Sequence, residues 1–168
     1  MKSFTRWSVF LVVAIRWPLV FAGELELQTK PMKLQFEPAF ILEAVAHRLD
    51  VDLRPQIAFP AIRLESVTSL EQFQDATEQQ WGFRSERFVN AFVAGTNEIY
   101  LIDDPAYYAE SGRTLAESLA HELAHYVQAR YGRASLYDWA ECEAVTVQKW
   151  FREMYLSPAA HAVATHQR

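Results

Sequence analysis

The sequence predicts a single α+β domain in which a small antiparallel β-hairpin packs on two consecutive helices. The chain has 168 residues, of which 51% are hydrophobic, and this is enough for one domain with a substantial core. Two short β-prone runs, 88–94 and 98–103, are separated by a Gly-Thr-Asn loop at 95–97, which predicts the hairpin. Two longer segments, 114–131 and 136–155, carry apolar residues at helical spacing and predict the helix pair.

The N-terminal segment, residues 1–22, has the features of a secretory signal peptide. Lys2 and Arg6 form a basic start, an apolar run follows, and the segment ends at the small residue Ala22, after which a signal peptidase would cleave. We therefore expect a secreted or periplasmic protein whose mature chain has no stable membrane span. The alternative is an uncleaved N-terminal membrane anchor, although the apolar run is too short to span a bilayer stably.

The elements that precede the hairpin are inferred from apolar spacing, prolines and capping residues. Pro60 bends the predicted strand and favours a place at the edge of the sheet, because proline cannot donate a ladder hydrogen bond. Ser69 followed by Gln72 is a capping-box pattern that begins a helix. The predicted order is a linker at 23–36, a helix at 38–49, a strand at 55–65 and a helix at 69–81. The folded domain is expected to span 37–156 and to be followed by a flexible tail at 157–168.

The helix predicted at 114–131 contains the motif His-Glu-x-x-His at positions 121–125. His121 and His125 lie one helical turn apart on the same face, so their imidazoles can converge on one metal ion. Glu122 points beside that ion and can hold a proton instead of a coordination position. This pattern is typical of zinc hydrolases, in which the glutamate is the general base.

A catalytic zinc site needs a third protein ligand, and the next helix offers Glu141 and Glu143. The link between the two predicted helices is short, so they should form an antiparallel hairpin that brings both carboxylates within reach of the histidines. Ala144 lies three residues after Glu141 and would let the helices approach closely, which favours Glu141. Glu143 lies in line with the core-facing residues of its helix, which favours Glu143. We slightly prefer Glu141 and keep both.

With these residues the chain resembles the gluzincin metallopeptidases, in which a His-Glu-x-x-His helix is followed by a helix with a glutamate ligand, often with Ala or Ser three positions later. The segment 141–144, Glu-Cys-Glu-Ala, matches that form, and the resemblance covers less than half of the chain. It implies a zincin-like fold with zinc ligands at His121 and His125 and with Glu122 as the base. Val145 departs from the pattern, because many members have an Asp or Asn there that orients a histidine.

The expected function is that of a zinc-dependent peptidase, with Zn²⁺ as the cofactor and a peptide or protein as the substrate. One alternative is a weakly active or inactive binding protein on the same scaffold with a structural zinc, and another is a small metal-free helical interaction domain. The formal net charge is −5 and no basic block occurs, so we expect no nucleic-acid partner. We expect the chain to be a monomer.

Overall fold

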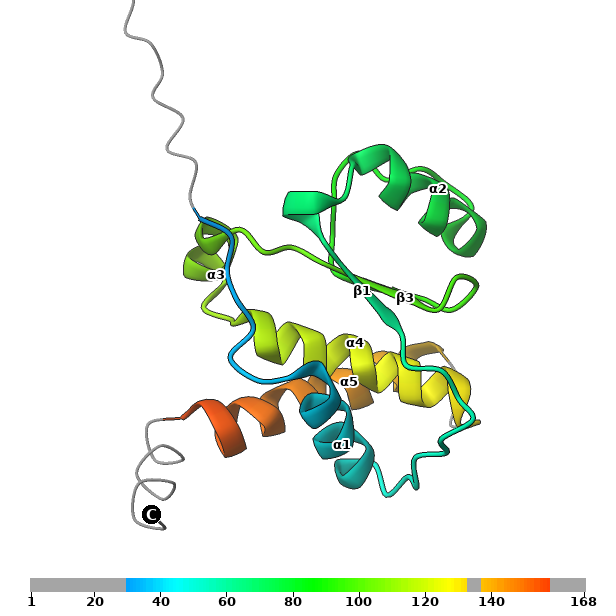
Figure 1. Cartoon of the computed structure of the whole chain (residues 1–168), viewed down its shortest axis with the longest axis vertical. Coiled ribbons are helices and arrows are strands. Elements are labelled where there is room, and N and C mark those ends of the chain that lie inside the picture. The colour runs from blue at the N-terminus through cyan, green and yellow to red at the C-terminus, as the bar shows by residue number, and fades with distance from the viewer. Residues whose placement is uncertain (1–29, 133–136, 158–168) are drawn as a thin grey trace, which may run out of the picture.

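The computed structural model describes residues 30–132 and 137–157, which form an α+β domain (Figure 1). The expected signal peptide and almost all of the expected tail lie outside the described residues. None of the helices in the described ranges has the length and apolar character needed to cross a lipid bilayer. The described part of the expected linker, 30–36, packs against the core, and the N–H of Met32 donates to the carbonyl oxygen of Asp103.

The fold has three layers. The strands are β1 (Ala61–Leu64), β2 (Ala91–Val93) and β3 (Glu98–Leu101), and the helices are α1 (Pro38–Arg48), α2 (Leu70–Trp81), α3 (Pro105–Ser111), α4 (Leu115–Arg130) and α5 (Tyr137–Phe151). A short 3-10 turn, η1 (Glu65–Val67), follows β1, and a π-helical segment, η2 (Arg152–Leu156), follows α5. The sheet lies between α2 on one face and α4, with α1 and α5 beyond it, on the other (Figure 1).

Side chains alternate between the two faces of the sheet, and both faces are covered. Phe92, Ile99 and Leu101 are buried in the core that α1, α4 and α5 share. Val93 and Tyr100 point to the opposite face and belong to the smaller core under α2. Because successive residues of a strand point to opposite faces, apolar residues at consecutive positions require a sheet that is buried on both sides.

The expectation of an antiparallel sheet is only partly right, because the sheet is mixed. β2 and β3 form the expected hairpin, but β1 pairs with β3 in parallel, with Ala61 opposite Glu98. The strand order is β1-β3-β2, so β1 lies at an edge directly after Pro60, as the proline predicts. The two strands of a hairpin are necessarily antiparallel because their connection is short. β1 is joined to the hairpin through α2, and a connection of that length allows β1 to pair in parallel.

Capping residues set the ends of α2 and α4 close to where the sequence predicts them. The Ser69 side chain accepts the N–H of Gln72, and the Gln72 side chain accepts the N–H of Ser69, so the predicted capping box is confirmed. Gly82 ends α2 in the left-handed conformation with a φ of 74°. Oγ1 of Thr114 accepts the N–H of Glu117 and begins α4, which is buried on nearly all sides.

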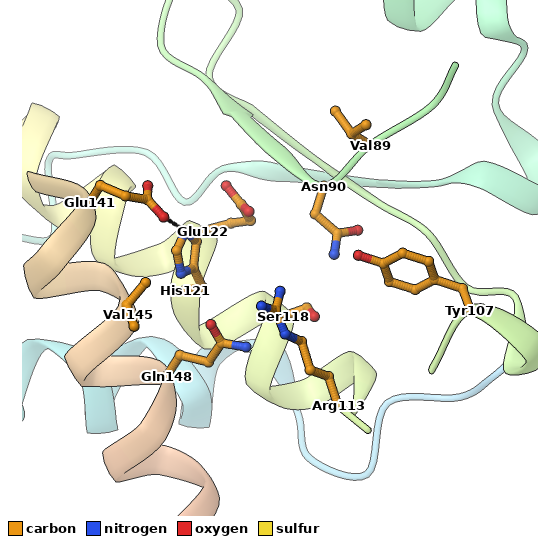
Figure 2. Close-up of a pocket in the computed structure, with 10 residues that line it drawn as sticks. All are labelled: Val89, Asn90, Tyr107, Arg113, Ser118, His121, Glu122, Glu141, Val145 and Gln148. Atoms are coloured by element: carbon orange, nitrogen blue, oxygen red, sulfur yellow. Dashed lines mark ion pairs between the residues drawn. The ribbon is translucent and has the colours of Figure 1, made fainter. Parts of the chain in front are cut away.

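The elements predicted from the sequence do not include α3, since none is predicted between the hairpin and the helix at 114–131. Oδ1 of Asp104 accepts the N–H of Ala106, and Pro105 occupies the first helical position. Gly112 ends the helix with a φ of 64°. This helix of seven residues places Tyr107 beside the N-terminal half of α4, where it becomes part of the candidate site (Figure 2).

Candidate metal centre

The packed pair α4 and α5 brings His121, His125 and Glu141 to one point. The two histidine Nε2 atoms lie 3.1 Å apart. Oε2 of Glu141 lies 3.2 Å from Nε2 of His125, and Oε1 lies 3.5 Å from Nε2 of His121 (Figure 2 shows the latter pair). These residues are the one group of His, Cys, Asp and Glu side chains within 30–132 and 137–157 that is placed to hold a metal ion.

The separations of these atoms are small enough for one metal ion to contact all three residues. Ligands that lie 2.0–2.1 Å from a zinc ion at the corners of a tetrahedron are about 3.3–3.4 Å from one another. The two nitrogens are 3.1 Å apart, and each lies 3.2 Å or 3.5 Å from a different oxygen of the Glu141 carboxylate. The two imidazole nitrogens and the Glu141 carboxylate thus converge on one point, and a tetrahedral ion held by these three residues would keep a fourth position for a water or a substrate atom.

The hydrogen bond on the outer side of His125 sets the tautomer of its ring. The amide nitrogen of Gln128 donates to the carbonyl of Ala140 at 2.8 Å and to Oε2 of Glu143 at 3.1 Å. Oε1 of Gln128 must therefore accept, and Nδ1 of His125, 2.9 Å away, must carry the proton. Nε2 of His125 then presents its lone pair to the centre. Glu143 thus lies one step outside the histidine-glutamate cluster, and its carboxylate contacts Gln128 instead.

A second glutamine lies beside His121 in a similar arrangement. The amide nitrogen of Gln148 donates to Oε1 of the buried Glu117 at 3.3 Å, and its side chain points toward the His121 ring (Figure 2). Glu117 is also paired with Arg152, whose Nε donates to Oε2 at 2.8 Å. Nδ1 of His121 is buried and makes no hydrogen bond of ordinary geometry.

Nε2 of His125 and the Glu141 carboxylate oxygen 3.2 Å from it are both acceptors, and a cation between two such atoms stabilises them. Burial lowers the pKa of His121 well below its usual range, and the charge of His125 lowers it further. The ring of His121 is therefore neutral at pH 7 and can act as a metal ligand. The chemistry of this donor set fits a divalent ion of the zinc type, because imidazole and carboxylate are both common zinc ligands.

Glu122 is buried next to this cluster but is not one of the three residues placed to hold a metal ion. Its carboxylate accepts a hydrogen bond from the backbone N–H of Phe92 in β2. Burial raises the pKa of Glu122 to about 8, and the hydrogen bond from Phe92 opposes that rise. A carboxyl group whose pKa lies near neutral pH is suited to take up and release a proton in a reaction.

The cluster lies at the middle of a cleft that follows the free edge of β2. On one side is a pocket of about 210 Å³ next to Val89 and Asn90, and on the other is a pocket of about 520 Å³ next to Phe92 and Ala94. His121, Glu122 and Glu141 line both pockets. A ligand that lies along the cleft therefore passes directly over these three side chains.

Part of this strand edge is already occupied by a side chain. The carboxamide of Gln80 in α2 donates to the carbonyl of Phe92 at 3.0 Å and accepts the N–H of Ala94 at 2.9 Å. It therefore satisfies two backbone groups in the way that a paired peptide would. A peptide that pairs along the whole edge has to displace Gln80.

Four of the five predicted site residues lie together in the structure. The fifth, Glu143, lies outside the cluster and contacts Gln128. Sequence reasoning missed Gln128 and Gln148, which face the two histidines. Their spacing carries a signal, because Gln128 is three residues after His125 and Gln148 is seven residues after Glu141. Glutamine is common on helix surfaces, however, so this spacing alone does not distinguish them.

We compared the chain with protein-family models, with curated proteins and with solved structures, and no match was found in any of the three comparisons.

Proposed function

We propose that this protein is a zinc-dependent peptidase of the gluzincin type with a zincin-like fold. The observation that carries the proposal is the convergence of the His121, His125 and Glu141 side chains on one point, with the buried acid Glu122 beside them. The motif helix, the following ligand helix and a strand edge above them are the parts that such a fold would need. Structural zinc sites are usually closed by four protein ligands, whereas three ligands and a cleft favour a catalytic one.

In this proposal the metal is held by the two histidines and Glu141, and Glu122 moves the proton. A bound zinc ion would supply Lewis acidity, which polarises a carbonyl group and lowers the pKa of a water molecule to about 7. Glu122 takes the proton from the attacking water and delivers it to the amine nitrogen as the peptide C–N bond breaks. A nearby cation also lowers the pKa of Glu122 and so favours its ionised form as a base.

The edge of β2 that pairs with no other described strand supports a peptide as the substrate, because displacing the Gln80 side chain exposes its backbone groups. An extended peptide can pair with the backbone of an edge strand, so its main chain is recognised without regard to sequence. A peptide bound along the cleft would pass over Glu122 and the ligand cluster, which line both of its pockets. The alternative of a non-catalytic binding protein uses the same edge but does not require a buried acid beside the metal.

The test is to load the purified protein with zinc, measure the metal content and incubate it with a broad peptide library read out by mass spectrometry. We expect about one zinc per chain and cleavage products. Glu122→Gln should lower hydrolysis by about 10²–10⁴-fold and keep the zinc, because the amide cannot accept the proton. Retained hydrolysis in this variant would overturn the role of Glu122. Zinc-loaded wild-type protein that cleaves no peptide would favour the binding protein instead.

A further inference from the structure

The smaller pocket beside the cluster is strongly polar on the side away from the metal ligands. Asn90, Tyr107, Arg113 and Ser118 line it, and Figure 2 shows their side chains converging on the space next to His121. Its volume of about 210 Å³ is small beside the roughly 300–1,000 Å³ of pockets that enclose drug-sized ligands. The pocket therefore has room for one short group of a ligand.

Arg113 supplies a positive charge to this pocket that no acid within 30–132 and 137–157 neutralises. No carboxylate within the described residues forms an ion pair or a hydrogen bond with its guanidinium. Its charge is close enough to lower the pKa of His121. The turn at Gly112, with a φ of 64°, separates α3 from α4 and places Arg113 directly before the α4 N-cap Thr114.

Further polar groups surround the guanidinium. Oγ of Ser118 is buried, and although it lies near the Tyr108 hydroxyl it makes no hydrogen bond of ordinary geometry. Oδ1 of Asn90 accepts the N–H of Ile102 at 2.7 Å, so its amide nitrogen is the end that faces the pocket (Figure 2). The hydroxyl of Tyr107 also points there (Figure 2). A cation with three hydrogen-bond donors around it is a binding site for an anion.

The direction of β2 indicates which part of a substrate reaches this pocket. The polar pocket lies at the start of the strand, beside Val89 and Asn90, and the larger pocket lies toward Ala94. Antiparallel pairing is the more stable arrangement, and it makes a bound peptide run from the Ala94 end to the Val89 end. The C-terminal part of the peptide, which leaves as the amine product, therefore lies in the pocket with Arg113.

We infer that the pocket formed by Asn90, Tyr107, Arg113 and Ser118 binds a carboxylate on the leaving side of the scissile bond, and that this carboxylate is the C-terminus of the substrate. The inference rests on the proposed peptidase function and specifies its substrate class. A single unpaired guanidinium matches the single charge of a carboxylate, and the small pocket holds one terminal residue. The enzyme would then release residues one at a time from the C-terminus of peptides.

The test compares three peptides that differ only at the C-terminus. The first is the free acid, the second is its C-terminal amide, and the third is an amide in which the last residue is replaced by Glu. The zinc-loaded protein should release the last residue from the free acid with a kcat/KM at least tenfold above that for the plain amide. Equal cleavage of the free acid and the plain amide would overturn the inference. Cleavage of the Glu amide as fast as the free acid would show that an acidic side chain supplies the carboxylate, and would overturn the C-terminal assignment.

Arg113 is tested by Arg113→Gln, Arg113→Lys and the matched control Arg63→Gln, which removes the same charge from the far edge of the sheet. Arg113→Gln should remove the preference for the free acid, chiefly by raising KM, and Arg113→Lys should keep part of it because the charge remains. Arg63→Gln should retain the full preference. An unchanged preference in Arg113→Gln would overturn the inference.

Binding without turnover separates this inference from the peptidase proposal. Zinc-loaded Glu122→Gln protein should bind the free acid at least tenfold more tightly than the amide in calorimetry, and Arg113→Gln in that background should abolish the difference. If no peptide is cleaved but this difference is found, the peptidase proposal fails and the carboxylate site stands. If neither cleavage nor a binding difference is found, both fail.

Discussion

Oε1 of Gln128 lies 2.9 Å from Nδ1 of His125, one helical turn further along α4. The glutamine is itself held by the carbonyl of Ala140 and by Glu143, so it cannot turn its amide nitrogen toward the ring without losing two hydrogen bonds. Groups that orient a metal-binding histidine in this way affect metal affinity almost as strongly as the ligands do. In the proposed zinc site, Gln128 would therefore be the residue that orients His125.

Gln128→Leu should weaken zinc binding by about 10–100-fold, because His125 loses the acceptor that sets its tautomer. Gln128→Glu keeps an acceptor at the same position and should retain more of the affinity. The measurement is a zinc competition titration with a chromophoric chelator. Gln72→Leu, on α2 and outside the cleft, is the control. Equal affinities for wild-type and Gln128→Leu protein would contradict the orienting role.

The choice between Glu141 and Glu143 can be settled by comparing matched variants. Glu141→Gln removes a carboxylate that lies 3.2 Å from Nε2 of His125, so zinc binding should fall by at least about 100-fold, as for a lost ligand. Glu143→Gln alters the contact with Gln128, which is not a metal ligand, and should cost about tenfold or less. Metal content after dialysis against a weak chelator checks both. The reverse order would assign the third ligand to Glu143.

The parts of the site that follow from local sequence could be predicted, and the parts that depend on packing could not. The spacing of His121 and His125 on one helix face is a property of the helix alone, and the caps at Ser69 and Thr114 are local as well. The choice between the two glutamates depends on how α5 is rotated against α4. The spacing of apolar residues does not determine that rotation, so the sequence alone leaves both glutamates as possible ligands.

The same distinction explains the sheet and the polar pocket. The hairpin is predicted because its loop is short. The parallel pairing of β1 with β3 instead joins residues far apart in the chain, such as Ala61 and Glu98, which are 37 positions apart. Arg113 is an exposed residue in a loop between two helices, and the sequence marks it in no way. It becomes a candidate only when α3, α4 and β2 are placed around one cavity.

The stability of the metal-free protein should fall as the pH rises from 6.5 to 8. Burial raises the pKa of Glu122 from 4.5 to about 8, so the folded state holds this proton more tightly than the unfolded chain and loses stability as the pH rises through that range. Burial lowers the pKa of His121 from 6.5, which makes stability rise with pH below 6.5. The two effects oppose each other below pH 6.5, and only that of Glu122 acts above it.

The expected loss between pH 6.5 and 8 is at most about 2 kcal/mol, since one unit of pKa corresponds to about 1.4 kcal/mol. Urea denaturation in the presence of a chelator measures it, and Glu122→Gln should flatten the curve above pH 6.5. If the wild type and the variant show the same slope, the carboxyl of Glu122 does not have a raised pKa. Added zinc should raise the stability of both proteins by mass action.

The ion pair of Glu117 with Arg152 should stabilise the fold through the buried carboxylate. The Glu117 side chain is 1% exposed and that of Arg152 is 46% exposed, so removing the arginine leaves a charge with little access to water. Arg152→Met should lower the free energy of unfolding by about 1–3 kcal/mol. This is less than the usual cost of breaking a fully buried ion pair, because Arg152 is partly solvated. Urea denaturation at pH 7 measures the change.

The double variant Glu117→Gln with Arg152→Met should recover part of this loss, because the neutral amide needs no counter-ion. A cycle of the two single variants and the double variant gives the coupling energy. A coupling energy near zero would show that Arg152 acts through its packing and not through the carboxylate of Glu117.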